Sequence, residues 1–60
     1  PDRVVLEGRK VAIIDYKFGD HNPRYVRQLR KYSEIWKRMG YEHVSAHLWY
    51  VHTGEVMDVL

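Results

Sequence analysis

Four consecutive apolar residues, Val11-Ala12-Ile13-Ile14, run directly into Asp15-Tyr16-Lys17 and set the architecture of this 60-residue chain. An apolar run without polar alternation is typical of a strand that is covered on both faces. A second β-branched run, Val4-Val5-Leu6, precedes it across Glu7-Gly8-Arg9-Lys10. Because Gly8 can supply the positive φ of a tight turn, the two runs predict a β-hairpin.

A helix is predicted to follow, from about residue 23 to residue 39. Asn22 is a favourable N-cap, Pro23 suits the first helical position, and Gly40 stands where a helix C-terminal glycine belongs. At 100° per residue, one apolar stripe emerges. It consists of Tyr25, Leu29, Tyr32, Trp36 and Met39.

Apolar and polar residues alternate from Val44 to Tyr50, which predicts a strand. His52-Thr53-Gly54 then indicates a turn, and Val56 to Leu60 a short returning strand. We therefore expect residues 1–60 to form a single α/β domain in the order β-β-α-β-β, with a mixed sheet and the helix across one face. One helix covers one face only, so we expect the other face to contact an element outside this chain.

Composition excludes several classes of protein. The chain has 10 Lys and Arg against 8 Asp and Glu, a net charge of +2, and no cysteine. The lack of cysteine excludes a disulfide scaffold, a thiolate zinc site and thiol catalysis. No apolar run approaches the ~20 residues of a membrane helix. We expect a soluble, cytoplasmic domain that is not bound to a membrane. Because it opens on Pro1 and not on Met, we expect it to be part of a longer protein.

Asp15 and Lys17 are candidate functional residues, because they are two apart at the end of the apolar run and point to the same face. If Glu7-Gly8 forms a two-residue turn, Asp2 faces Ile13 and has Asp15 as its diagonal neighbour, about 7–8 Å away. Two carboxylates with an open side suit Mg²⁺ or Mn²⁺, and a nearby lysine can assist a water or stabilise a phosphate.

Two alternatives stay open at this point. Asp15 and Lys17 can form a simple salt bridge at the edge of the sheet. A three-residue loop would turn Asp2 to the other face and would remove the site.

Three motifs in order resemble the PD-(D/E)XK nuclease superfamily. They are Pro1-Asp2, then Asp15-Tyr16-Lys17 within Ile14–Gly19, and Gln28-Leu29-Arg30-Lys31-Tyr32 on the helix. The sequence of these motifs is similar to that of the RecB/AddA-like branch, which comprises the nuclease domains of helicase–nucleases. The resemblance runs through nearly the whole chain.

The resemblance implies a partial restriction-endonuclease-like core whose front helix, with its acidic or histidine residue, is missing from this chain. It implies Mg²⁺ or Mn²⁺ as cofactor, DNA as substrate, and the rest of a parent chain, with possible helicase domains, as partner. The implied roles are metal binding by Asp2, Asp15 and the Tyr16 carbonyl, catalysis by these acids with Lys17, and site support or DNA contact by Gln28 and Tyr32.

Six of the ten basic residues lie on the predicted helix, mostly opposite its apolar stripe: Arg24, Arg27, Arg30, Lys31, Lys37 and Arg38. They can form a phosphate-binding surface or simply a solvated face. His43 and His47 share a face of a strand but lie ~13 Å apart along it, too far to chelate one ion.

The leading hypothesis is a metal-dependent DNA nuclease that processes DNA ends. We expect this chain alone to bind metal weakly and to cleave little, because two acids form an incomplete metal shell. The alternatives are a nuclease-like module that binds nucleic acid or protein without cleavage, and a structural domain. Self-association through the uncovered sheet face is a further alternative.

Overall fold

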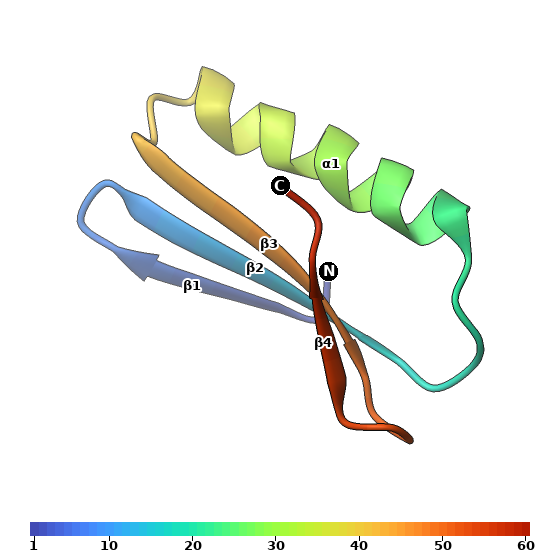
Figure 1. Cartoon of the computed structure of the whole chain (residues 1–60). Coiled ribbons are helices and arrows are strands. Elements are labelled where there is room, and N and C mark those ends of the chain that lie inside the picture. Colours follow the sequence, from blue (N-terminus) through green and yellow to red (C-terminus); the bar gives the residue numbers. More distant parts are fainter.

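The computed structural model describes all residues, 1–60, and contains five elements. They are β1 (Arg3–Glu7), β2 (Lys10–Lys17), α1 (Pro23–Arg38), β3 (His43–Tyr50) and β4 (Glu55–Asp58). The four strands form one sheet in the order β1-β2-β3-β4. β2 and β3 are parallel, whereas the two outer pairs are antiparallel. The predicted mixed α/β arrangement, with α1 across one face, is confirmed (Figure 1).

The turn between β1 and β2 differs from the predicted one. Glu7 pairs with Lys10, so the loop residues are Gly8 and Arg9. Gly8 has a φ of 58°, whereas Arg9 does not have a positive φ. This combination is typical of a type II′ turn, which takes glycine at its first central position. The register is therefore shifted by two residues, which leaves every side chain on the face that the sequence predicted.

The helix begins as predicted. The Asn22 side chain accepts a hydrogen bond of 2.9 Å from the N–H of Arg24, and Pro23 is the first helical residue. The helix ends at Arg38, one residue earlier than predicted, with Met39 as the C-cap. Gly40 follows with a φ of 99°, the left-handed conformation that glycine adopts at helix ends.

The core lies between α1 and the sheet. Its buried apolar residues are Val11, Ile13, Leu29, Ala46, Leu48, Tyr50 and Val59. Tyr25, Tyr32 and Trp36 of the predicted helical stripe pack against this core, but Met39 is 63% exposed. Ser33, which is not part of the predicted stripe, is fully buried, and its hydroxyl donates a 2.8 Å hydrogen bond to the Leu29 carbonyl. A local bond to the preceding turn lets a polar residue occupy an apolar interface.

No element of this chain covers the other face of the sheet (Figure 1). Ile14 and Tyr16 of β2 are half-buried there, and Trp49 of β3 is 41% exposed. The rings of Tyr16 and Trp49 lie 5.6 Å apart, centroid to centroid. The one helix, α1, has neither the length nor the hydropathy of a membrane-spanning segment.

Candidate functional site

Asp15 and Lys17 lie at the end of β2, on the face that α1 covers. In the parallel ladder Asp15 pairs with Leu48 and Lys17 with Tyr50, both of which are core residues. The Lys17 Nζ atom lies 3.0 Å from Asp15 Oδ2, and the two side chains are only 24% and 22% exposed. The salt bridge that the sequence left open as an alternative is therefore present, at a site largely shielded from water.

Asp2 reaches the same end of β2. The β1–β2 ladder begins at the pair Arg3 and Ile14, so one further step along this register places Asp2 opposite Asp15, not diagonal to it. The N–H of Tyr16 donates a 2.8 Å hydrogen bond to Asp2 Oδ2. The correction to the turn thus brings the two acidic residues closer together than the predicted register did.

The pKa of Asp2 lies below its ordinary value of 3.8. The largest cause is the adjacent Asp15 side chain, followed by the hydrogen bond from the Tyr16 N–H, and the positive charges of the N-terminus and Lys17 act in the same direction. Asp2 is therefore ionised at neutral pH, the form in which a carboxylate can bind a cation.

Tyr25 completes the surroundings of Lys17, although no sequence motif assigned it to this site. The Lys17 Nζ atom lies 4.3 Å from the centroid of the Tyr25 ring, a cation–π contact. Tyr25 is in the first turn of α1, directly after the loop that leaves Lys17. The sequence feature that could have indicated this contact is the place of Tyr25 on the apolar stripe, because the stripe faces the sheet where β2 ends.

Gln28 and Tyr32 are the other two residues to which the sequence resemblance assigns a role. Neither forms a hydrogen bond with Asp2 or Asp15. Gln28 is exposed, and its implied role in site support or DNA contact stays a prediction. At 100° per residue it lies about a quarter-turn from the buried Leu29, beyond the edge of the sheet contact. Tyr32 packs against the core, as predicted for an aromatic residue on the stripe, with its ring 6.3 Å from Trp36.

The donor set at the end of β2 fits a hard cation that keeps several waters. No group of three or more histidine, cysteine or carboxylate side chains is arranged to hold a metal ion. Mg²⁺, however, is commonly bound through one or two carboxylates. Asp2 and Asp15 supply two, and the Tyr16 carbonyl points to the same strand edge as the Tyr16 N–H that contacts Asp2.

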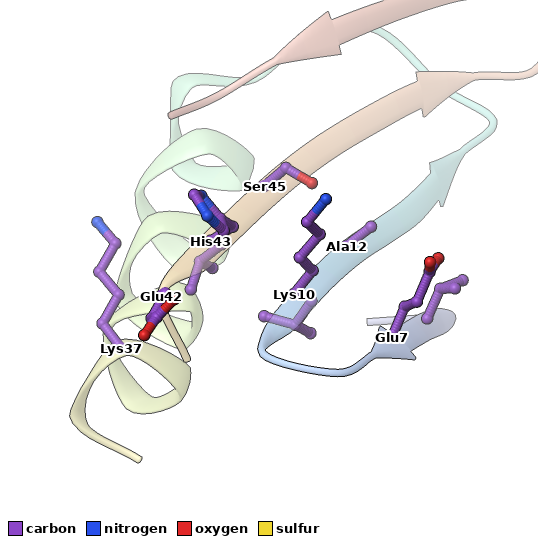
Figure 2. Close-up of a pocket in the computed structure, with 10 residues that line it drawn as sticks. Glu7, Lys10, Ala12, Lys37, Glu42, His43 and Ser45 are labelled. Atoms are coloured by element: carbon purple, nitrogen blue, oxygen red, sulfur yellow. The ribbon is translucent and has the colours of Figure 1, made fainter. Parts of the chain in front are cut away.

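The largest hollow lies elsewhere, at the opposite end of β2 beside the β1–β2 turn. It has a volume of about 530 Å³, and Glu7, Lys10, His43 and Ser45 are among its lining residues (Figure 2). None of the acidic pair or Lys17 lines it. The hollow therefore plays no part in the site at the end of β2.

The predicted strand position of the histidines is confirmed, because both His43 and His47 lie in β3. His47 Nδ1 contacts Asp58 Oδ1 of β4 at 2.6 Å, whereas His43 lies at the edge of the hollow. The two rings thus have different surroundings.

Fold and site together define a small mixed α/β domain that carries two acidic residues and a lysine at the end of a central strand. No protein-family model, curated protein or solved structure matches this chain.

Proposed function

We propose that this chain is the core of a metal-dependent DNA nuclease domain of the PD-(D/E)XK type, with a restriction-endonuclease-like fold. The observation that supports it best is the meeting of Asp2 and Asp15 beside Lys17 at the end of β2. The setting that the sequence resemblance implies, a helicase–nuclease that processes DNA ends, is part of the same proposal.

Each residue has a distinct task under this proposal. Asp2 and Asp15 would hold Mg²⁺ or Mn²⁺, with the Tyr16 carbonyl as a further oxygen donor. The metal, when bound, supplies polarisation of the phosphate and a more acidic water. Lys17 would stabilise the negative charge that develops on the phosphate, or orient the attacking water. Tyr25 would hold the Lys17 ammonium group in place through the 4.3 Å contact with its ring.

One observation favours the alternative, a nuclease-like module that binds nucleic acid or protein without cleaving it. Lys17 already pairs with Asp15, and only two carboxylates reach the site. A cation must therefore compete with the ammonium group for Asp15. This competition supports our expectation that the 60-residue chain binds metal weakly and cleaves little.

Measurements of metal binding and of DNA cleavage distinguish the nuclease from the binding module. Mn²⁺ should broaden the backbone amide NMR signals of Asp15 and Tyr16, because it is paramagnetic and would lie beside them. Asp15→Asn should abolish this broadening, and Lys17→Ala should leave it in place.

The matched control is Asp20→Asn, which removes the same charge from the exposed loop after β2. It should change neither broadening nor cleavage. Cleavage of linear DNA is measured on this chain and on the longer protein that we propose contains it, where Asp15→Asn and Lys17→Ala should each abolish or nearly abolish activity. Undiminished cleavage by Asp15→Asn would refute the nuclease proposal for this site, and metal binding without cleavage in the longer protein would favour the binding module.

A further inference from the structure

The outer side of α1 carries a stripe of basic residues. We call it the basic stripe, and it consists of Arg24, Arg27, Lys31 and Arg38. At 100° per residue these four positions fall within about 60° of one another, centred opposite Leu29. Leu29 is 4% exposed and packs on the sheet, so the stripe points to solvent, and all four of its residues are exposed.

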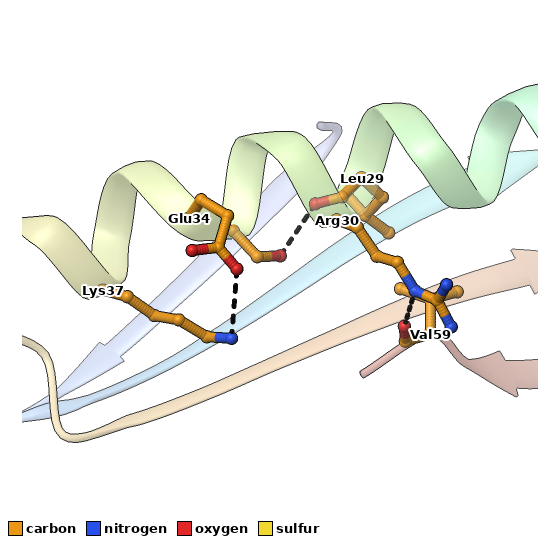
Figure 3. Close-up of polar contacts among 6 residues, drawn as sticks. Leu29, Arg30, Glu34, Lys37 and Val59 are labelled. Atoms are coloured by element: carbon orange, nitrogen blue, oxygen red, sulfur yellow. Dashed lines mark hydrogen bonds and ion pairs between the residues drawn. The ribbon is translucent and has the colours of Figure 1, made fainter.

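The four side chains of the basic stripe have no carboxylate partner, since none of the ion pairs in the structure includes them. The other two basic residues of α1 are engaged (Figure 3). Lys37 Nζ lies 3.4 Å from Glu34 Oε1, and Arg30 Nε donates a 2.6 Å hydrogen bond to the Val59 carbonyl. Glu34 is the only acidic residue of the helix, and it faces Lys37.

The dimensions of the stripe fit a regular polyanion. Arg24 and Arg38 are 14 positions apart, which corresponds to about 21 Å along a helix. One strand of duplex DNA presents about six phosphates over this distance, at 3.4 Å of axial rise each. A bilayer is a poor alternative, because the apolar face that an interfacial helix would insert is already packed on the sheet.

We propose that the basic stripe binds the sugar–phosphate backbone of duplex DNA, without sequence preference and without metal. This inference rests on the proposed function, because that function is the reason for choosing DNA as the ligand. It does not require that the chain cleaves DNA. Arg24 is adjacent to Tyr25, whose ring contacts Lys17, so the stripe begins beside the candidate site and extends away from it. It would therefore hold DNA that flanks the segment at Asp15, on a side of the domain that the acidic pair does not reach.

The test is the salt dependence of binding to a short mixed-sequence duplex by fluorescence anisotropy, with EDTA present. Each phosphate contact contributes about −0.9 to the slope of log K against log salt concentration, so four contacts give about −3.6. Affinity should then fall ~150-fold between about 50 and 200 mM salt. Arg27→Gln/Lys31→Gln should lower affinity and halve the slope to about −1.8. Glutamine keeps the helix propensity close to that of lysine and arginine, so the fold should be retained.

The matched control is Arg3→Gln/Lys10→Gln, with one change on the edge strand β1 and one on its neighbour β2. It also removes two positive charges, so both variants change the net charge from +2 to 0. The control should keep the slope of the unmodified chain. An equal change in both variants, an unchanged slope in Arg27→Gln/Lys31→Gln, or no binding at low salt would overturn the inference. Because EDTA removes metal, such a failure leaves the nuclease proposal intact. Undiminished cleavage by Asp15→Asn would instead refute the nuclease proposal and leave binding by the basic stripe intact.

Discussion

Ile13→Val and Ile14→Val form a matched pair that tests which face of the sheet α1 covers. The two residues are neighbours in β2, and each change removes one methylene with little difference in β-propensity. Ile13 is 0% exposed beneath α1, whereas Ile14 is half-buried on the uncovered face. Ile13→Val should therefore cost about 1 kcal/mol, including the cavity that it leaves. Ile14→Val should cost about 0.4 kcal/mol, half the value for a fully buried methylene.

Urea unfolding followed by circular dichroism measures the difference. A domain of this size has about 3–9 kcal/mol of stability in total, so a larger truncation such as Leu48→Ala risks unfolding it outright. With an m-value of about 1 kcal/mol/M, the midpoint should fall by ~1 M for Ile13→Val and by ~0.4 M for Ile14→Val. Equal shifts, or a larger shift for Ile14→Val, would refute the placement of α1. Asp15 and Lys17 would then no longer lie on the helix-covered face, because they share the face of Ile13.

Two further predictions concern the ends of β1 and α1. The pKa of Asp2 is lower in the folded chain than its ordinary value of 3.8, so its ionised form stabilises the fold above that pH, and this contribution is lost as pH falls through the folded pKa. Carboxyl-carbon NMR should give a folded pKa for Asp2 below 3.8, and the stability advantage over Asp2→Asn should shrink as pH falls below 3.8; a measured pKa at or above that value contradicts the contacts with Asp15 and Tyr16. Asn22→Ala should lower the free energy of unfolding by about 1 kcal/mol in thermal or urea denaturation, because the Arg24 N–H loses its acceptor, and Asn22→Asp, which keeps an acceptor, should lower it far less. Equal losses in the two Asn22 variants would exclude the cap as the cause.

The strand and helix pattern was predictable because local signals agreed with one another. Asn22-Pro23 and Gly40 mark the helix ends, and the alternation from Val44 to Tyr50 marks β3. The register of the first hairpin was not predictable to the residue. Gly8 suits either central position of a two-residue turn, since types I′ and II′ both accept it, and only the observed pairing of Glu7 with Lys10 distinguishes them.

The convergence of Asp2, Asp15 and Lys17 was predictable, but the full surroundings of these residues were not. The spacing of Asp15 and Lys17 predicts a shared face, and the structure places Asp2 beside them. The contact of Lys17 with Tyr25 depends on where the first turn of α1 docks on the sheet, which no spacing rule encodes. The exposure of Gln28 was not predictable for a similar reason, because helical periodicity gives an angle around the helix but not the width of the sheet beneath it.

The two tryptophans lie on opposite sides of the sheet, so their intrinsic fluorescence can report on each side separately. Trp36 packs between α1 and the sheet with its indole nitrogen buried, 5.2 Å from the Tyr41 ring, whereas Trp49 stands 41% exposed on the uncovered face. Emission from Trp36 therefore reports the docking of α1, and quenching of Trp49 by acrylamide reports access to the opposite face. Replacing either residue by phenylalanine isolates one signal. A molecule that covers the open face would shield Trp49 from the quencher and leave Trp36 unchanged, so its arrival could be followed without any added label.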